Sequence, residues 1–440
     1  MYFINKEESL TIDMILAYIN DFKINELNRM LKNKRYYDCK NDAITNRTFS
    51  DITKPNNKYT SSWAKYITTL ISGYFMGKPV TYWTNDNRLS DILSKNHEHE
   101  IMHNQNIEKD CSIYGMAAEI LYLDSDKSVK FERVDPTTVI PIYSGDIEKE
   151  LLYVIRFWDR EDIVTHMKKT YIDVHSKNFV TSYLKSSDGI KKINEEINVF
   201  DGVNINIFYN NSDATGDAEP VLRLIDGYDL ALSDTANFRE ELNDSYLVFK
   251  NTNLETEDVI QMKQKRIISI EDTEQGMQSS VSWLNKDSND AEQENYKQRL
   301  AEDIKKFSFV ADIETAKSHT TATSAKIGLL GIEQVCIDKE SQFRKSLLNR
   351  AHLICSIERT RGYKVSTNDL TITFVRNIPL DLSVIGDTVA KLSPFVSKRT
   401  LLSQIPFVSD IDEELKQKAL EDKLHAYEED IFAGDGVNEQ

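Results

Sequence analysis

Cysteine is scarce in this sequence, with four residues in 440. The four are Cys39, Cys111, Cys336 and Cys355. They form no CxxC pair and no other spacing typical of a metal site. So few cysteines in so long a chain imply no disulfide framework and suggest a reducing compartment.

Long apolar runs are also missing. The most apolar stretch, residues 63–80, is interrupted by Lys65 and Lys78. The amino-terminal apolar stretch is interrupted by Asp13, and no basic region precedes it. The sequence therefore predicts neither a signal peptide nor a transmembrane helix.

Positive charge is in deficit, because 54 Lys and Arg stand against 71 Asp and Glu, for a net charge of -17. Proteins that grip nucleic acid neutralise phosphates with clustered basic residues, so this balance argues against that class. It does not exclude a surface past which DNA slides. A hydrophobic content of 40% in a chain of this length indicates a soluble globular protein of two or three domains.

The first half of the chain combines helices with short strands. Helices are predicted at 9–33, at 63–76, where aromatic and aliphatic residues recur at three and four, and at about 89–113. Six successive strands follow, at about 117–124, 129–135, 138–144, 151–158, 170–176 and 178–185. Their spacing, with Asp, Gly and Pro turns between them, predicts an antiparallel sheet and an α+β fold.

The pattern changes at about residue 217. A helix of about seven turns is predicted there, with Pro220 in its first turn. A small module of strand, helix and two further strands follows, and then a second long helix at 288–307. The order suggests two antiparallel struts that carry a compact tip. A helix of about 33 residues begins near 325 and ends near Gly362, and one strand and a helical carboxy-terminal region complete the chain.

The segment HEIMH, His99 to His103, matches the zinc-peptidase pattern H-E-x-x-H. On a helix this spacing places two imidazoles on one face, with Glu100 positioned as a general base. The third ligand is lacking, because Asn106 and Lys109 stand where the metzincin extension needs Gly and His, and Glu119 falls in a predicted strand. The alternative interpretation is a solvated helix face.

Other candidate sites are weaker. GYFMGKP, residues 73–79, has three residues between its glycines where a phosphate loop has four, and Pro79 replaces the magnesium-binding hydroxyl, so it is interpreted as a helix C-cap. The basic residues at 263–267 and at Arg344, Lys345 and Arg350 are interpreted as solvated helix faces. A catalytic function would therefore depend on HEIMH alone.

Several segments, taken in order, resemble the portal proteins of tailed bacteriophages, of the type found in siphophages of Gram-positive bacteria. These segments are YITTLISGYFMGKPVTY, CSIYGMAAEILYLD, VDPTTVIPIY, GDAEPVLRLIDGYDLALSDTANFREELNDSYLVFK, YKQRLAEDIKKFSF, SAKIGLLGIEQ and ITFVRNIPLDL. The most distinctive is SDTAN, Ser233 to Asn237. The resemblance spans nearly the whole chain.

This resemblance implies a homo-oligomeric ring, usually a dodecamer, at one capsid vertex. It implies that double-stranded DNA is packaged and ejected through the channel of this ring and that a separate ATPase drives the packaging, so we expect no enzymatic activity, no cofactor and no metal in this chain. The implied partners are the terminase large subunit, then a head-completion adaptor, with scaffold and major capsid proteins around the ring and no membrane. The implied location is the virion, with host cytoplasm during assembly. Another ring-forming connector and a zinc metallopeptidase remain the alternatives.

The resemblance also implies a division of the chain into portal subdomains. These are a wing at 1–216, stem helices at 217–245 and 288–307, a clip at 246–287, a tunnel loop at 308–326, a spine helix with a returning wing strand at 327–376, and a crown and tail at 377–440.

The predicted tunnel loop is rich in hydroxyl groups and has sparse positive charge. Its candidate channel residues are Lys317, His319, Thr320, Thr321, Thr323, Ser324 and Lys326. Hydroxyl groups there would offer DNA weak, exchangeable hydrogen bonds. The alternative interpretation is a surface connection between helices.

Overall fold

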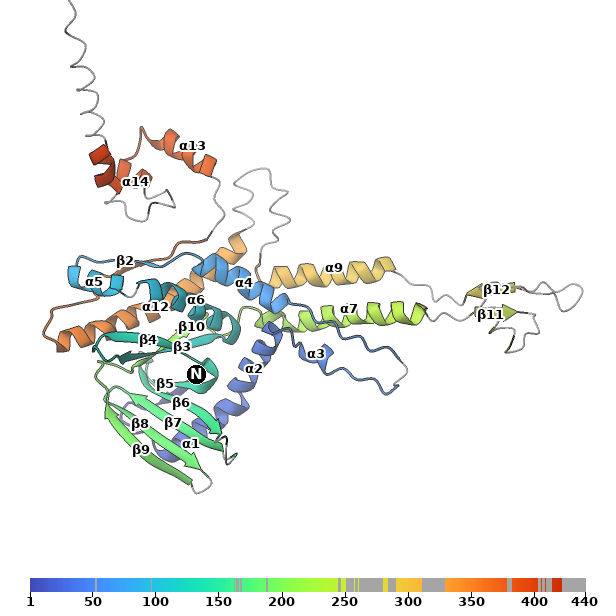
Figure 1. Cartoon of the computed structure of the whole chain (residues 1–440), viewed down its shortest axis with the longest axis horizontal. Helices are drawn as coiled ribbons and strands as arrows, with labels where there is room; N and C mark the ends of the chain where they lie inside the picture. The colour runs from blue at the N-terminus through green and yellow to red at the C-terminus, as the bar shows by residue number, and fades with distance from the viewer. Residues whose placement is uncertain are drawn as a thin grey trace, which may run out of the picture. The chain divides into compact units, whose positions relative to one another are not determined.

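Figure 1 shows the computed structural model of the chain. The described residues are 1–51, 54–95, 97–161, 163, 166, 168–186, 189–243, 247–250, 257, 260, 280–283, 290–310, 329–377, 382–402, 405, 408 and 414–421. The chain divides into two compact units, Met1–Asn377 and Ile378–Gln440. Helices and sheets are both present, which confirms the α+β prediction.

Two helices lie near the amino terminus of the first unit, where the sequence predicted one at 9–33. Helix α1 is Ile12–Ile24 and α2 is Glu26–Tyr37, with Asn25 between them. The hydroxyl of Thr11 accepts a hydrogen bond from the Met14 amide at 3.3 Å and caps α1. The predicted helix at 89–113 is likewise two helices, α5 (Asn87–Lys95) and α6 (His97–Tyr114). Neither break contains glycine or proline, the residues that usually mark a helix end in sequence.

Two sheets follow, and all six predicted strands are confirmed among them. The larger has the order β1-β5-β6-β7-β8-β9 and the smaller the order β10-β3-β4. The strands are β1 (Tyr2–Ile4), β3 (Met116–Leu123), β4 (Val129–Val134), β5 (Val139–Ser144), β6 (Leu151–Glu161), β7 (Lys168–Ser176), β8 (Phe179–Ser186), β9 (Gly189–Ile197) and β10 (Ile205–Tyr209). Pairing is antiparallel except between β1 and β5, which are parallel. Strands β1, β9 and β10 were not predicted.

The described residues of the first unit form three hydrophobic clusters, of which two are large. In one, α1 and α2 pack on the sheets, and the rings of Phe22 and Phe157 meet edge to face at 5.9 Å. In the other, α4 (Trp63–Met76) and α6 pack with the long helix α12 (Leu330–Thr360). There the ring of Phe343 lies 5.8 Å from Phe75 and 4.8 Å from Phe208. Ile67 and Ile71 of the periodic face of α4 lie in this core, and Trp63, Tyr66 and Tyr74 pack against it.

A helical hairpin extends from the second core. The short helix η2 (Glu219–Val221) leads into α7 (Leu222–Asn243), and α9 (Asp290–Phe307) returns beside it (Figure 1). Helix α7 has 22 residues, about six turns where the sequence predicted about seven. Between the two helices along the chain, β11 (Leu247–Lys250) pairs with β12 (Ser280–Trp283) in antiparallel register. The first of the two further strands predicted for the small module, RIISIE at 266–271, lies outside the described residues.

Helix α12 is 31 residues long, about 46 Å at 1.5 Å per residue. It ends just before Gly362, which has a φ of +88°, a left-handed conformation that favours glycine. Strand β13 (Thr371–Thr373) then pairs with β2 (Thr81–Trp83). The long helix and the returning strand were both predicted.

The second unit contains α13 (Leu382–Leu392) and α14 (Lys398–Leu402) among its described residues. Across the part of the chain that the structure describes, no helix combines the length and apolar character that a bilayer crossing requires.

Candidate functional site

The seven predicted channel residues, from Lys317 to Lys326, lie outside the described residues. The chain on either side of them is described. Ser308 and Val310, just after α9, are buried, and Ile332 at the start of α12 joins the same core. A Cβ built on Gly331 would lie 3.5 Å from the carbonyl oxygen of Phe309. The described residues that precede and follow 311–328 therefore lie next to each other.

An extended segment, residues 57–61, is fastened along α7, and we call it the strap. The backbone amide of Ser61 donates to Asp229 Oδ1 at 2.9 Å, and that of Tyr59 donates to Ser233 Oγ at 3.0 Å. The amide of Asn57 donates to Asn237 Oδ1 at 2.7 Å. Alternate backbone amides of the strap thus donate hydrogen bonds to side chains that stand four residues apart on α7.

This ladder explains why polar residues stand in the middle of α7. Asp229 and Ser233 are fully buried and Asn237 is 6% exposed, so each needs a hydrogen-bond partner. Burial raises the pKa of Asp229 above its usual value, and hydrogen bonds from Ser61 and Asn41 oppose that shift. The SDTAN motif therefore contributes Ser233 and Asn237 to strap binding.

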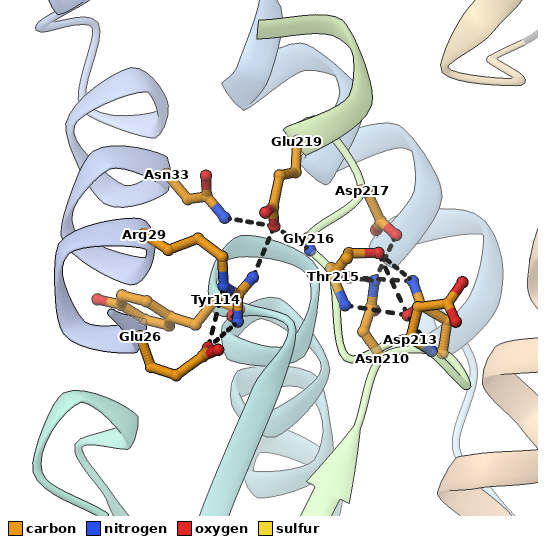
Figure 2. Close-up of polar contacts among 11 residues, drawn as sticks. Glu26, Arg29, Asn33, Tyr114, Asn210, Asp213, Thr215, Gly216, Asp217 and Glu219 are labelled. Atoms are coloured by element: carbon orange, nitrogen blue, oxygen red, sulfur yellow. Dashed lines mark hydrogen bonds and ion pairs between the residues drawn. The ribbon is translucent and has the colours of Figure 1, made fainter. Parts of the chain in front are cut away.

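The entrance to α7 is held by a second polar cluster (Figure 2). Glu219 accepts hydrogen bonds from Arg29 at 2.7 Å and from Asn33 at 2.8 Å, both on α2. It also accepts one from the Gly216 amide at 3.0 Å. One carboxylate thus joins α2 to the segment that leads into the hairpin.

Gly115 permits this segment to lie close to the end of α6. A Cβ at position 115 would lie 2.1 Å from the carbonyl oxygen of Ala214, and the φ of Gly115 is +87°. Both observations require glycine there, since an L side chain would clash and would strain the backbone. The Gly115 carbonyl accepts a hydrogen bond from the Asn210 amide at 3.0 Å.

A buried lysine joins α12 to the same segment. Lys339 Nζ lies 2.7 Å from Glu108 Oε1 on α6, 2.9 Å from Asp217 Oδ2 and 2.5 Å from Asn210 Oδ1. The side chains of Lys339, Glu108 and Asp217 are each no more than 2% exposed. We call these three residues the lysine cluster. It connects the long helix, α6 and the hairpin entrance through one ammonium group.

The lysine cluster contains one more negative than positive group. Burial raises the pKa of Glu108 to about 7, against the opposing pull of Lys339. Burial alone would lower the pKa of Lys339, but Asp217 and Glu108 raise it above its usual value. Glu108 Oε2 has no hydrogen-bond partner among the described residues. Neutralisation of this cluster therefore depends on Lys339 and on a proton that Glu108 binds near neutral pH.

The HEIMH segment lies on α6, and its interpretation as a solvated face is wrong for two of its residues. Glu100 and His103 are each 5% exposed, whereas His99 is exposed and lies 3.3 Å from Glu132. The solvated-face interpretation is also wrong for Arg350, which is 2% exposed. Its charge is buried because α12 packs along β10 of the smaller sheet, from where the guanidinium group reaches Glu100 on α6 and Glu119 on β3.

Arg350 binds both carboxylates of this region. Its Nη1 lies 2.8 Å from Glu100, and its Nε and Nη2 lie 2.8 and 2.7 Å from the two oxygens of Glu119 on β3. His103 Nε2 lies 2.7 Å from Glu119 Oε2. Burial alone would raise the pKa of Glu119, but Arg350 and His103 lower it to about 2.

These contacts do not suit a zinc site. The guanidinium group occupies the position between the carboxylates where a cation would bind, and His103 already shares a hydrogen bond with Glu119. Among the described residues, no group of three or more His, Cys, Asp or Glu is arranged to hold a metal ion. Glu100 and His103 of HEIMH thus belong to a buried ion-pair cluster with Glu119 and Arg350.

Sequence reasoning missed the residues that connect the elements. Lys339 and Glu219 were not singled out, and the partners of Lys339 are 122 or more residues away in the chain (339 − 217). One available signal was a lysine in line with the apolar residues of α12, one turn from Cys336 and Phe343. A charge in an apolar stripe indicates a buried partner.

Comparison with known proteins gives consistent matches along the chain. The family model described as phage portal protein, SPP1 Gp6-like, matches residues 16–425. The portal protein of Bacillus phage SPP1 is 23% identical over 437 residues, which cover 91% of this chain and 84% of that protein. The portal protein of Clostridium phage phiCD119 is 22% identical over 439 residues, which cover 90% and 93%.

Proposed function

Because the chain belongs to the SPP1 Gp6-like family of phage portal proteins, we propose that it is the subunit of a homo-oligomeric ring at one capsid vertex. Double-stranded DNA enters and leaves the capsid through the channel of this ring. The observation that carries the proposal is the family match over residues 16–425, which includes the strap, the hairpin and the long helix. The protein acts as a structural conduit and component of the virion.

The division into subdomains follows from this assignment. Residues 1–216 form the wing, and α7 and α9 belong to the stem helices at 217–245 and 288–307. The clip spans 246–287, the spine helix and returning strand lie within 327–376, and the crown and tail begin at 377. The proposal is supported by the order of elements, since two packed helices flank a segment that contains a small antiparallel strand pair.

The tunnel loop at 308–326 contacts DNA in this proposal, through Lys317, His319, Thr320, Thr321, Thr323, Ser324 and Lys326. Support comes from the described residues on either side of this segment, since Phe309 and Gly331 lie next to each other. A net charge of -17 suits a conduit, because tight phosphate binding would oppose translocation. A hydroxyl group both donates and accepts, so it can exchange one hydrogen-bond partner for another at little cost in free energy.

The clip contacts the terminase large subunit during packaging and a head-completion adaptor afterwards. The wing and crown face scaffold and major capsid proteins. Assembly takes place in the host cytoplasm, and the ring then remains in the virion. Packaging energy comes from the terminase, so the portal needs no catalytic site of its own.

Negative-stain imaging of the purified protein tests this proposal. We expect rings, in dodecameric form, with a central hole. A monodisperse monomer under all assembly conditions would contradict it. Restoration of DNA packaging to a portal-deficient phage distinguishes a portal from another ring-forming connector, because a different connector would leave packaging absent.

A further inference from the structure

A groove of about 800 Å³ runs along the hairpin, and we call it the hairpin groove. One side is the strap, which contributes Tyr59, and the other is α9, which contributes Lys297 and Ala301. Between them lies the face of α7 that carries Leu232 and Ala236. The strap and α9 hold α7 on its two flanks, so the face between them is left open.

The opposite side of the hairpin presents an exposed aromatic residue. Tyr296 is 55% exposed on α9, and Arg299 is 70% exposed, one turn away, with its Nε 3.0 Å from Asp303. We call Tyr296, Arg299 and Asp303 the outer face of α9. At 3.6 residues per turn this face points away from Gln298 and Ala301, which line the groove.

From these two surfaces we infer that the hairpin groove receives the outer face of α9 from a second copy of this chain, with Tyr296 as the inserted side chain. The inference rests on the proposed ring. A groove and a projection on opposite sides of one hairpin form a head-to-tail contact, which repeats around a ring when the rotation closes. Tyrosine is a frequent anchor at interfaces, because its ring buries about 150–250 Å² and its hydroxyl finds a polar partner.

Charge is balanced on both of these surfaces. Two copies that each carry -17 repel one another, so their contact requires surfaces with balanced charge. Four charged residues line the groove, and their charges sum to zero: Arg239, Glu240, Glu294 and Lys297. On the outer face Arg299 is paired with Asp303. Glu294 pairs with Lys297 of its own chain at 2.5 Å, and its side chain, 63% exposed, also offers a carboxylate oxygen to Arg299 of the neighbouring copy.

The contact is an anchor within a larger interface. A stable interface buries about 800 Å² on each partner, several times what one tyrosine covers. Replacement of Tyr296 therefore weakens assembly without unfolding the subunit, since its side chain is largely exposed in the isolated chain.

The test uses two cysteines on opposite faces of α9, Tyr296→Cys and Gln298→Cys, in a background with Cys39→Ser because Cys39 is the one native cysteine that is not buried. Across one helix, about 10–12 Å wide with its side chains, the two thiols cannot reach disulfide distance. Oxidation should therefore link different chains and give a ladder of dimers, trimers and higher species on a denaturing gel. The matched control, Gln298→Cys with Ala301→Cys, places both thiols on the groove side and should give no ladder.

Imaging the same samples separates the two hypotheses. Rings with a ladder support both. Rings in which both thiols stay reduced and open to labelling overturn the groove contact and leave the ring intact. Wild-type protein that forms neither rings nor oligomers overturns the proposed function.

A second comparison needs no oxidation. Tyr296→Ala should raise the protein concentration for half-maximal assembly about tenfold or more, and Tyr296→Phe should raise it less. Tyr122→Ala, which removes an exposed tyrosine from β3, serves as control and should leave assembly unchanged. Equal behaviour of Tyr296→Ala and Tyr122→Ala would count against the groove contact.

Discussion

Replacement of Lys339 by methionine should be among the most destabilising single changes in the chain. Methionine keeps most of the side-chain volume but removes the ammonium group that Glu108 and Asp217 share at 2.7 and 2.9 Å. Both carboxylates are at least 98% buried, so water cannot replace the lost partner. Removal of one partner from a buried ion pair costs about 3–5 kcal/mol of unfolding free energy.

Urea unfolding followed by tryptophan fluorescence and circular dichroism measures this loss. With a slope of about 3 kcal/mol per M, a loss of 3–5 kcal/mol lowers the midpoint by about 1–2 M. Samples should be compared in the same oligomeric state, because assembly stabilises the folded subunit by mass action. The slope should stay constant if only native-state energy changes.

Lys345→Met is the matched control, because it makes the same chemical change on the exposed side of α12. Its midpoint should change by no more than the equivalent of about 0.5 kcal/mol. The combined variant Lys339→Met, Glu108→Gln, Asp217→Asn removes all three charges and should recover part of the loss. The reasoning is refuted if Lys339→Met and Lys345→Met unfold at the same urea concentration.

Three further outcomes are expected. The pKa of Glu108 is raised to about 7 from an unfolded value of 4.5, so its contribution to stability is complete below pH 4.5 and is lost as pH rises through 7. Glu108→Gln should therefore make the urea midpoint less dependent on pH across that range. If the midpoint of Glu108→Gln varies with pH as the wild-type midpoint does, the shift is contradicted. Arg350→Lys should destabilise by about 2 kcal/mol or more in the same assay, since one ammonium cannot bind Glu100 and both oxygens of Glu119; wild-type stability would contradict that geometry. Asn237→Ala should cost about 1–2 kcal/mol and speed proteolysis within the strap, and unchanged cleavage would show that the ladder does not hold the strap.

Elements with a strong local pattern could be predicted from the sequence. The face of α4 follows the helical period, and the long helix has apolar residues such as Phe343 and Leu347 at the same spacing. Strands β3 to β8 are separated by turn residues. By contrast, β9 has exposed residues along nearly its whole length, since it is an edge strand, and its charged sequence lacks the alternation of a half-buried strand.

The polar contacts could not be predicted in the same way. Glu100 and His103 look like surface residues, because their helix is rich in charge and the cation that buries them, Arg350, stands 250 residues from Glu100. Which charges are buried depends on how α12 packs against α6, and local periodicity does not record that. Ser233 and Asn237 were recognised as distinctive, but their spacing is explained only by an extended strap that runs alongside.

The hydrogen bonds of the strap join a repeat of two residues in the strap to a repeat of four residues in α7, and the two repeats are nearly equal in length. Four residues of α-helix rise about 6.0 Å and two residues of extended chain rise about 6.6 Å, so each rung shifts the register by about 0.6 Å. After two steps, from Asp229 to Asn237, the offset is about 1.2 Å. Beyond Asn237 the contact is made by a side chain, since Asn57 Nδ2 donates to Glu240 at 2.7 Å. One residue inserted between Asn57 and Ser61 would turn the remaining amides to the opposite side, since alternate amides of an extended chain point in opposite directions. The strap should therefore tolerate substitution at Lys58 far better than any change in its length.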